Sequence, residues 1–146
     1  MENKPIALIG GTLIDGTGAD PVENSAVLID GKTIVKAGKQ AQISLPGGCE
    51  VIDAAGKTVM PGLIDLHVHL SFEPLSVLRS GLPGYLSRPL PWFGIISYAN
   101  ARKAFEMGFT TLRDVGEMIG EYSPIALRNA INGGIVQGPR IYASGP

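Results

Sequence analysis

Cysteine and histidine are scarce in this chain of 146 residues, which contains one cysteine, Cys49, and two histidines. A single cysteine excludes an intrachain disulfide and suits a reducing compartment, so we predict a cytoplasmic protein. Cys49 has no supporting base beside it in the sequence, and we do not expect it to act as a nucleophile.

The sequence also lacks an excess of charge of either sign. The chain has 12 lysines and arginines in total and 13 aspartates and glutamates, which gives a net charge of −1. Without a basic stripe, nucleic acid and anionic membrane surfaces are not expected partners. No run approaches the ~20 apolar residues of a membrane span, and the N-terminus lacks the cationic start and apolar run of a secretory signal. The chain is long enough for roughly one globular domain.

Glycine and proline, in contrast, are abundant, with 20 and 11 copies, which predicts many turns between short elements. Residues 1–60 show apolar, β-branched runs and no pattern of helix length. Asp30-Gly31 between two such runs favours a hairpin with a type I′ turn. We therefore predict a β-sandwich segment over residues 1–60. Its strands are expected at residues 6–9, 12–14, 26–29, 32–37, 50–53 and 58–60.

From residue 61 onward, the pattern changes to alternating strands and helices, which predicts a parallel sheet and an α/β fold. Strands are expected at 63–70, 109–115 and 140–144, and a long loop over 71–90. One helix should run from 91 to about 107 and bury Tyr98, Ala101 and Phe105, and another should start with Ser123 as its N-cap. A flavodoxin-like domain is the weaker alternative, because no phosphate-cradling glycine motif follows the first parallel strand.

The first of these strands carries both histidines. Side chains alternate between the faces of a strand, so Asp65, His67 and His69 share one face, and Ile64, Leu66, Val68 and Leu70 form the opposite, core-packed face. Two imidazoles about 6–7 Å apart at Cα can converge on one cation at ~2.0–2.1 Å. The alternative is a pair of core histidines that only form hydrogen bonds.

The run Pro61–Leu70, PGLIDLHVHL, resembles the first barrel strand of the amidohydrolase superfamily, whose signature is PG-x-(I/V)-D-x-H-x-H. The segments Gly108–Gly116 and Gly138–Gly145 are similar to barrel strands two and three, most of all in the branch of imidazolonepropionase-like and Xaa-Pro dipeptidase-like enzymes. The segments Gly11–Gly16 and Asp30–Ile34 resemble the N-terminal sandwich of these hydrolases. The resemblance implies that residues 61–146 form the first three strands of a (β/α)₈ TIM-type barrel, which takes roughly 250 residues when complete.

The resemblance further implies that His67 and His69 bind zinc or another divalent transition metal, in a site that is dinuclear in the complete enzyme. Such a protein hydrolyses C–N bonds of small amide or peptide-like substrates through a metal-activated water. Its other ligands and catalytic aspartate come from later strands. This chain is thus expected to be the N-terminal portion, inactive alone and completed by an oligomer or a partner chain. The alternative is a non-catalytic fragment or assembly module.

Three further residues are candidates for supporting roles. Asp65 either orients an imidazole or hydrogen-bonds backbone at the barrel floor. Asp114 either approaches the site or forms a structural ion pair or cap. Ser144 either contacts substrate or is a plain turn residue. Four residues in or beside the 71–90 loop either line an entrance or are ordinary surface residues: Glu73, Tyr85, Arg88 and Trp92.

Overall fold

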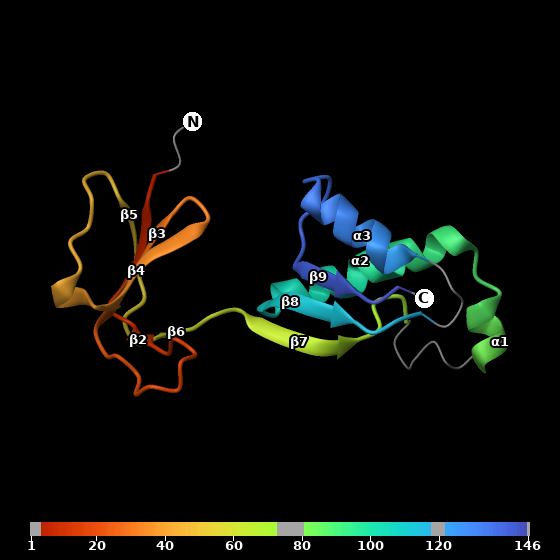
Figure 1. The fold of residues 1–146 in the computed structure, drawn as a ribbon, viewed down its shortest axis with the longest axis horizontal. Coiled ribbons are helices and arrows are strands. Elements are labelled where there is room, and N and C mark those ends of the chain that lie inside the picture. Colours follow the sequence, from red (N-terminus) through yellow and green to blue (C-terminus); the bar gives the residue numbers. More distant parts are fainter. Residues whose placement is uncertain (1–3, 73–80, 118–121, 146) are drawn as a thin grey trace. The chain divides into compact units, whose positions relative to one another are not determined.

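The computed structural model describes residues 4–72, 81–117 and 122–145. The chain divides into two compact units, Met1–Pro61 and Gly62–Pro146 (Figure 1). No helix in the described part of the chain is both long enough and apolar enough to cross a membrane.

The first unit is built of short strands in two sheets. The four-stranded sheet has the order β4-β3-β1-β5, with β1 antiparallel to β3 and parallel to β5. A second sheet pairs β2 with β6 in parallel. The strands are β1 (Ile6–Ile9), β2 (Thr12–Leu13), β3 (Ser25–Asp30), β4 (Thr33–Lys39), β5 (Glu50–Asp53) and β6 (Thr58–Val59), and a 3-10 helix, η1, covers Gln40–Gln42. The buried side chains that hold this unit together are Ala7, Leu13, Ala26, Val27, Leu28 and Ala54.

The hairpin predicted between β3 and β4 is present, with Asp30 paired to Thr33 across the turn. The predicted type I′ turn is wrong. That turn needs a positive φ at both central residues, which here are Gly31 and Lys32. Gly31 has a φ of +57°, but Asn24 is the only non-glycine residue with a positive φ in the described part of the chain.

The second unit is a three-stranded parallel sheet with helices between its strands, as the alternating pattern predicts. Its order is β7-β8-β9, formed by β7 (Leu63–Val68), β8 (Phe109–Asp114) and β9 (Arg140–Ala143). The helices are α1 (Gly81–Leu86), α2 (Leu90–Glu106) and α3 (Ser123–Asn132). Each of the three strands ends one or two residues earlier than expected, and α2 starts one residue earlier. In addition, α1 lies inside the expected 71–90 loop, and Tyr122, not Ser123, is the N-cap of α3.

Helix α2 buries only part of the stripe predicted for it, because Ala101 is buried and Tyr98 packs against the core but Phe105 does not. Phe93, Ser97 and Ala101 are buried, whereas Phe105 is 41% exposed. In a helix of 3.6 residues per turn, two side chains four residues apart point in directions that differ by about 40° around the helix axis. Phe105 is three such intervals of four residues beyond Phe93, so its side chain points away from the buried side of α2. The core of this unit consists of Leu70, Ala101, Leu112, Leu127 and Ile141.

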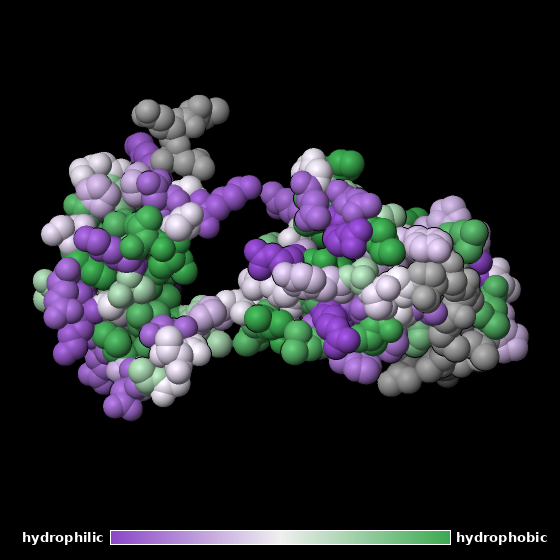
Figure 2. Space-filling model, viewed as in Figure 1, coloured by the Kyte–Doolittle hydropathy of each residue, from purple (hydrophilic) through white to green (hydrophobic). Residues whose placement is uncertain are grey.

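Strand β7 packs less of its apolar face than its sequence predicts. Ile64 is 60% exposed and Leu66 is 62% exposed, whereas Leu70 is buried and Val68 packs against the core. Hydrophobic side chains therefore gather on the surface over β7 (Figure 2). The reason is the position of β7 at the end of the sheet order, while α2 packs on β8 and α3 on β9. The prediction of a core-packed face is thus wrong for Ile64 and Leu66.

Candidate functional site

The two histidine rings lie side by side at the carboxyl end of β7. Their centroids are 5.6 Å apart and their planes meet at 75°. Both side chains are exposed. The two-residue spacing of a strand thus places the two imidazoles together at the end where parallel strands present ligand-binding groups.

The ring of His69 is held by two contacts. Its Nδ1 lies 2.8 Å from the carbonyl oxygen of Gly116, and its face stacks on Phe72 at a centroid distance of 4.6 Å and an angle of 11°. A carbonyl oxygen only accepts hydrogen bonds, so Nδ1 carries the proton in this contact. In a neutral ring the other nitrogen, Nε2, then has a free lone pair.

Asp65 contacts the backbone next to it. Its Oδ1 accepts the backbone N–H of His67 at 3.0 Å. Within the described residues, this carboxylate bonds that backbone group and neither imidazole. Asp65 therefore restrains the backbone conformation between itself and His67.

Asp114 is 1% exposed and lies at the end of β8. Its Oδ2 accepts the N–H of Leu70 at 2.8 Å, and its Oδ1 accepts the N–H of Gly116 at 3.1 Å. The carboxylate thus joins the segment that follows β7 to the segment that follows β8. Of the two alternatives for Asp114, the geometry is that of a backbone cap.

Ser144 shares a cavity with His69. Its Oγ donates to the carbonyl of Gly145 at 3.0 Å, and its backbone N–H donates to the carbonyl of Asp114 at 3.2 Å. The cavity holds about 310 Å³ and opens where the three parallel strands end. It is lined by His69, Phe72, Val115, Gly116, Glu117, Ser144 and Gly145.

The candidate entrance residues lie in different settings. Tyr85 is only 8% exposed and meets Phe72 and Phe93 edge to face, at centroid distances of 5.8 and 5.1 Å. It is therefore a packing residue. The guanidinium of Arg88 lies 5.1 Å from the centre of the Trp92 ring. Glu73 lies outside the described residues.

Sequence reasoning missed Asn100, a half-buried residue of α2. Its Nδ2 donates to the carbonyl oxygens of Leu70 and Phe72, at 2.8 Å each. Asparagine is a poor helix former because its side chain competes for backbone hydrogen bonds. The sequence signal that could have found it is an asparagine inside a predicted helix, one residue before the expected buried residue Ala101.

The donor set fits a transition metal only in part. Imidazole nitrogens suit zinc and related divalent ions, and His67 and His69 offer two of them. No group of three or more His, Cys, Asp or Glu side chains able to hold a metal occurs among the described residues. Catalytic zinc commonly has three protein ligands, so this chain contributes a partial set.

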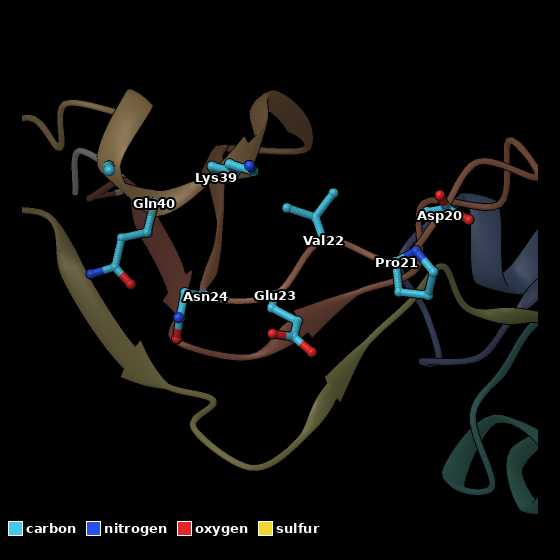
Figure 3. A pocket seen from close by; sticks show the side chains of 8 residues that line it. Asp20, Pro21, Val22, Glu23, Asn24, Lys39 and Gln40 are labelled. Carbon is cyan, nitrogen blue, oxygen red and sulfur yellow. The ribbon is translucent and has the colours of Figure 1, made fainter.

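Another hollow lies within the first unit and contains none of the predicted site residues. It holds about 980 Å³ and is lined by Asp20, Pro21, Val22, Glu23, Asn24, Lys39, Gln40 and Ala41. Figure 3 shows that the carboxylates of Asp20 and Glu23 do not converge on a common point. This hollow has no cluster of groups suited to catalysis or metal binding.

Comparison with known proteins agrees with the motifs. The sequence profile of the amidohydrolase family matches residues 58–146. The dihydroorotase of Pelotomaculum thermopropionicum is 33% identical over an alignment of 132 residues, which covers 84% of this chain and 26% of that protein.

Solved structures give the same result. A Xaa-Pro dipeptidase with methionine in its active site has a TM-score of 0.77 and 32% identity, over 97% of this chain and 33% of that one. Phenylurea hydrolase B has a TM-score of 0.83 and 31% identity, over 97% of this chain and 30% of that one. This chain spans about a quarter to a third of the length of these relatives. The profile match over more than half of its residues shows that the chain belongs to the amidohydrolase family.

Proposed function

We propose that this chain contributes His67 and His69 to the metal site of an enzyme that hydrolyses C–N bonds in small amide or peptide-like molecules. The observation that carries the proposal is the pair of imidazoles, 5.6 Å apart at the strand end, with His69 lining a cavity. The relatives support the reaction class, since a dihydroorotase, a Xaa-Pro dipeptidase and a phenylurea hydrolase are named for amide-like or urea-like substrates.

We assign residues 61–146 to the first three strands of a (β/α)₈ barrel and residues 1–60 to a sandwich segment. The parallel order β7-β8-β9 supports this assignment, as does a cavity lined by the segments that follow all three strands. Because the chain spans about a third of its relatives or less, the remaining ligands and the catalytic aspartate come from elsewhere. The chain alone is then inactive.

When bound, zinc or another divalent transition metal supplies an acidified water and polarises the scissile carbonyl. The chain's own residues prepare the site for that ion. His67 and His69 offer ring nitrogens, Asp65 and Asp114 hold the backbone that carries them, and the hydroxyl of Ser144 lines the cavity where a polar group of the substrate would lie.

A non-catalytic assembly module is the second candidate function. The exposed apolar side chains of β7, Ile64 and Leu66, favour it, because uncovered apolar surface of this kind marks interaction sites. In that case the chain docks on a partner and its histidines bind no metal.

Zinc titration of the purified chain tests the proposal. We expect the wild type to bind zinc, the variant His67→Ala/His69→Ala to lose it, and Cys49→Ser to bind as the wild type does. The last variant is the matched control, because it removes the only thiol of the chain. Retention of zinc by the double histidine variant would overturn the proposed site.

Activity separates the two candidate functions. Hydrolysis of dihydroorotate and of a set of Xaa-Pro dipeptides is measured. The enzyme sample contains this chain either fused to the remainder of the barrel or mixed with it. Hydrolysis that requires both histidines supports the enzyme. A zinc-free complex without hydrolysis supports the assembly module.

A further inference from the structure

The turn that follows β7 is held from two sides by side chains that are not themselves proposed metal ligands. We call residues His69–Phe72 the His69 turn. On one side, Asp114 accepts the N–H of Leu70 at 2.8 Å. On the other side, Asn100 of α2 donates to the carbonyls of Leu70 and Phe72, at 2.8 Å each. The backbone immediately after His69 is therefore fixed in place, and this restricts the position of the His69 side chain.

The same carboxylate also holds the group that meets the His69 ring. Asp114 Oδ1 accepts the N–H of Gly116 at 3.1 Å, and the carbonyl of Gly116 accepts the proton of His69 Nδ1 at 2.8 Å. Gly116 has a φ of +119°, where side chains are strained. A Cβ built there would lie 3.4 Å from the carbonyl oxygen of Gly145 and 3.5 Å from Ser144 Oγ.

We infer that Asp114 and Asn100 are positioning residues that fix the tautomer of His69, with Nδ1 protonated toward Gly116 and Nε2 kept open as the metal-binding nitrogen. Asp114 bonds both ends of this arrangement: the residue after His69 and the residue whose carbonyl receives the ring proton. Stacking on Phe72 limits rotation of the ring. The metal-binding role rests on the proposed function, whereas the tautomer is a property of the chain itself.

His67 provides an internal comparison. Within the described residues, its ring makes no hydrogen bond and meets the ring of His69 edge-on. Nothing in this arrangement selects one of its two nitrogens for protonation. The metal-free chain should therefore contain one histidine with a fixed tautomer and one with a mixture.

Two-bond ¹H–¹⁵N NMR spectra of the histidine rings test the inference. The ¹⁵N-labelled, metal-free chain is measured at a pH where both rings are neutral, and His67→Ala assigns the signals. We expect His69 to show a single tautomer protonated on Nδ1, and His67 to show both. A wild-type His69 protonated mainly on Nε2 would overturn the inference, whether or not the chain binds zinc.

Variants separate positioning from general stability. Asp114→Asn places an amide N–H against one of the two backbone donors, and Gly116→Ala displaces the accepting carbonyl. Each should convert His69 to a mixture while His67 stays unchanged, and should weaken zinc binding about 10–100-fold. Ile141→Val is the matched control, since it trims a buried side chain of β9 that is outside this network. If Ile141→Val changes the His69 tautomer as much as the other two variants do, the inference is wrong.

Discussion

The side-chain amide of Asn100 donates to the carbonyl of Leu70 at 2.8 Å, which ties the middle of α2 to the turn that follows β7. The same nitrogen donates to the carbonyl of Phe72. One nitrogen therefore satisfies two carbonyl groups of a turn beside the candidate metal ligands. Buried or half-buried carbonyls without a partner are costly, so this residue should matter for stability as well as for geometry.

Replacing Asn100 tests that relationship. Asn100→Ala removes the donor, and we expect a loss of about 1–3 kcal/mol in the free energy of unfolding. Asn100→Asp should cost more, because a carboxylate oxygen would face two carbonyl oxygens. Urea unfolding of the two variants beside the wild type measures the difference. An Asp variant at least as stable as the Ala variant would contradict the assigned hydrogen bonds.

Gly62, just before β7, should not tolerate a side chain. A Cβ at this position would overlap Oγ1 and Cγ2 of Thr110 in β8 and would lie 2.7 Å from its Cβ. We expect Gly62→Ala to destabilise the chain by about 1–3 kcal/mol through overpacking. Gly47→Ala is the control, because a Cβ there meets nothing within 4 Å and its φ is not positive. Equal melting temperatures for the two variants would contradict the predicted clash.

Two leucines of the second unit should respond very differently to truncation. Leu112 of β8 is 1% exposed and belongs to the core, whereas Leu66 of β7 is 62% exposed. Leu112→Ala should cost about 2–5 kcal/mol because it leaves a cavity. Leu66→Ala should stay within about 0.5 kcal/mol of the wild type. Chemical denaturation compares them, and a Leu66 variant as unstable as the Leu112 variant would show that β7 is covered.

The pKa of Asp15 is held below its usual value by hydrogen bonds from Thr17, first from the backbone N–H and second from the hydroxyl. A carboxyl with a lowered pKa in the folded state stabilises the fold above its unfolded pKa of about 4. That contribution is lost as the pH falls through the folded value. Thr17→Ala removes the hydroxyl only, so the pKa of Asp15 should rise part of the way back.

An NMR titration of the Asp15 carboxyl checks this prediction. Thr17→Ser keeps a hydroxyl and is the control, so it should leave the pKa of Asp15 close to the wild-type value. No rise in Thr17→Ala would mean that the backbone N–H alone sets the pKa.

The histidine pair could be predicted from the sequence because the cause is local. A strand repeats every two residues, so His67 and His69 must share a face once β7 forms. The parallel sheet follows from the alternation of strands and helices along the chain, and the helices themselves follow from composition and period. These features depend on neighbours along the chain.

What the sequence could not show depends on distant partners. Asn100 is 28 to 30 residues from the carbonyls it binds, and Asp114 is 44 residues from Leu70. Alternation in β7 predicts an apolar face, but exposure of Ile64 depends on whether a helix covers it. Phe105 has the right residue type for a core, yet helix rotation turns it outward.

The incomplete cover of β7 has a practical consequence for anyone who prepares this chain. One long side of β7 has no neighbouring strand among the described residues, and Leu63, Ile64 and Leu66 are exposed on that strand. A strand of this kind can recruit an identical strand from another copy. Turbidity that grows with protein concentration, and that a charged substitution at Leu66 reduces, would be the sign of this self-association.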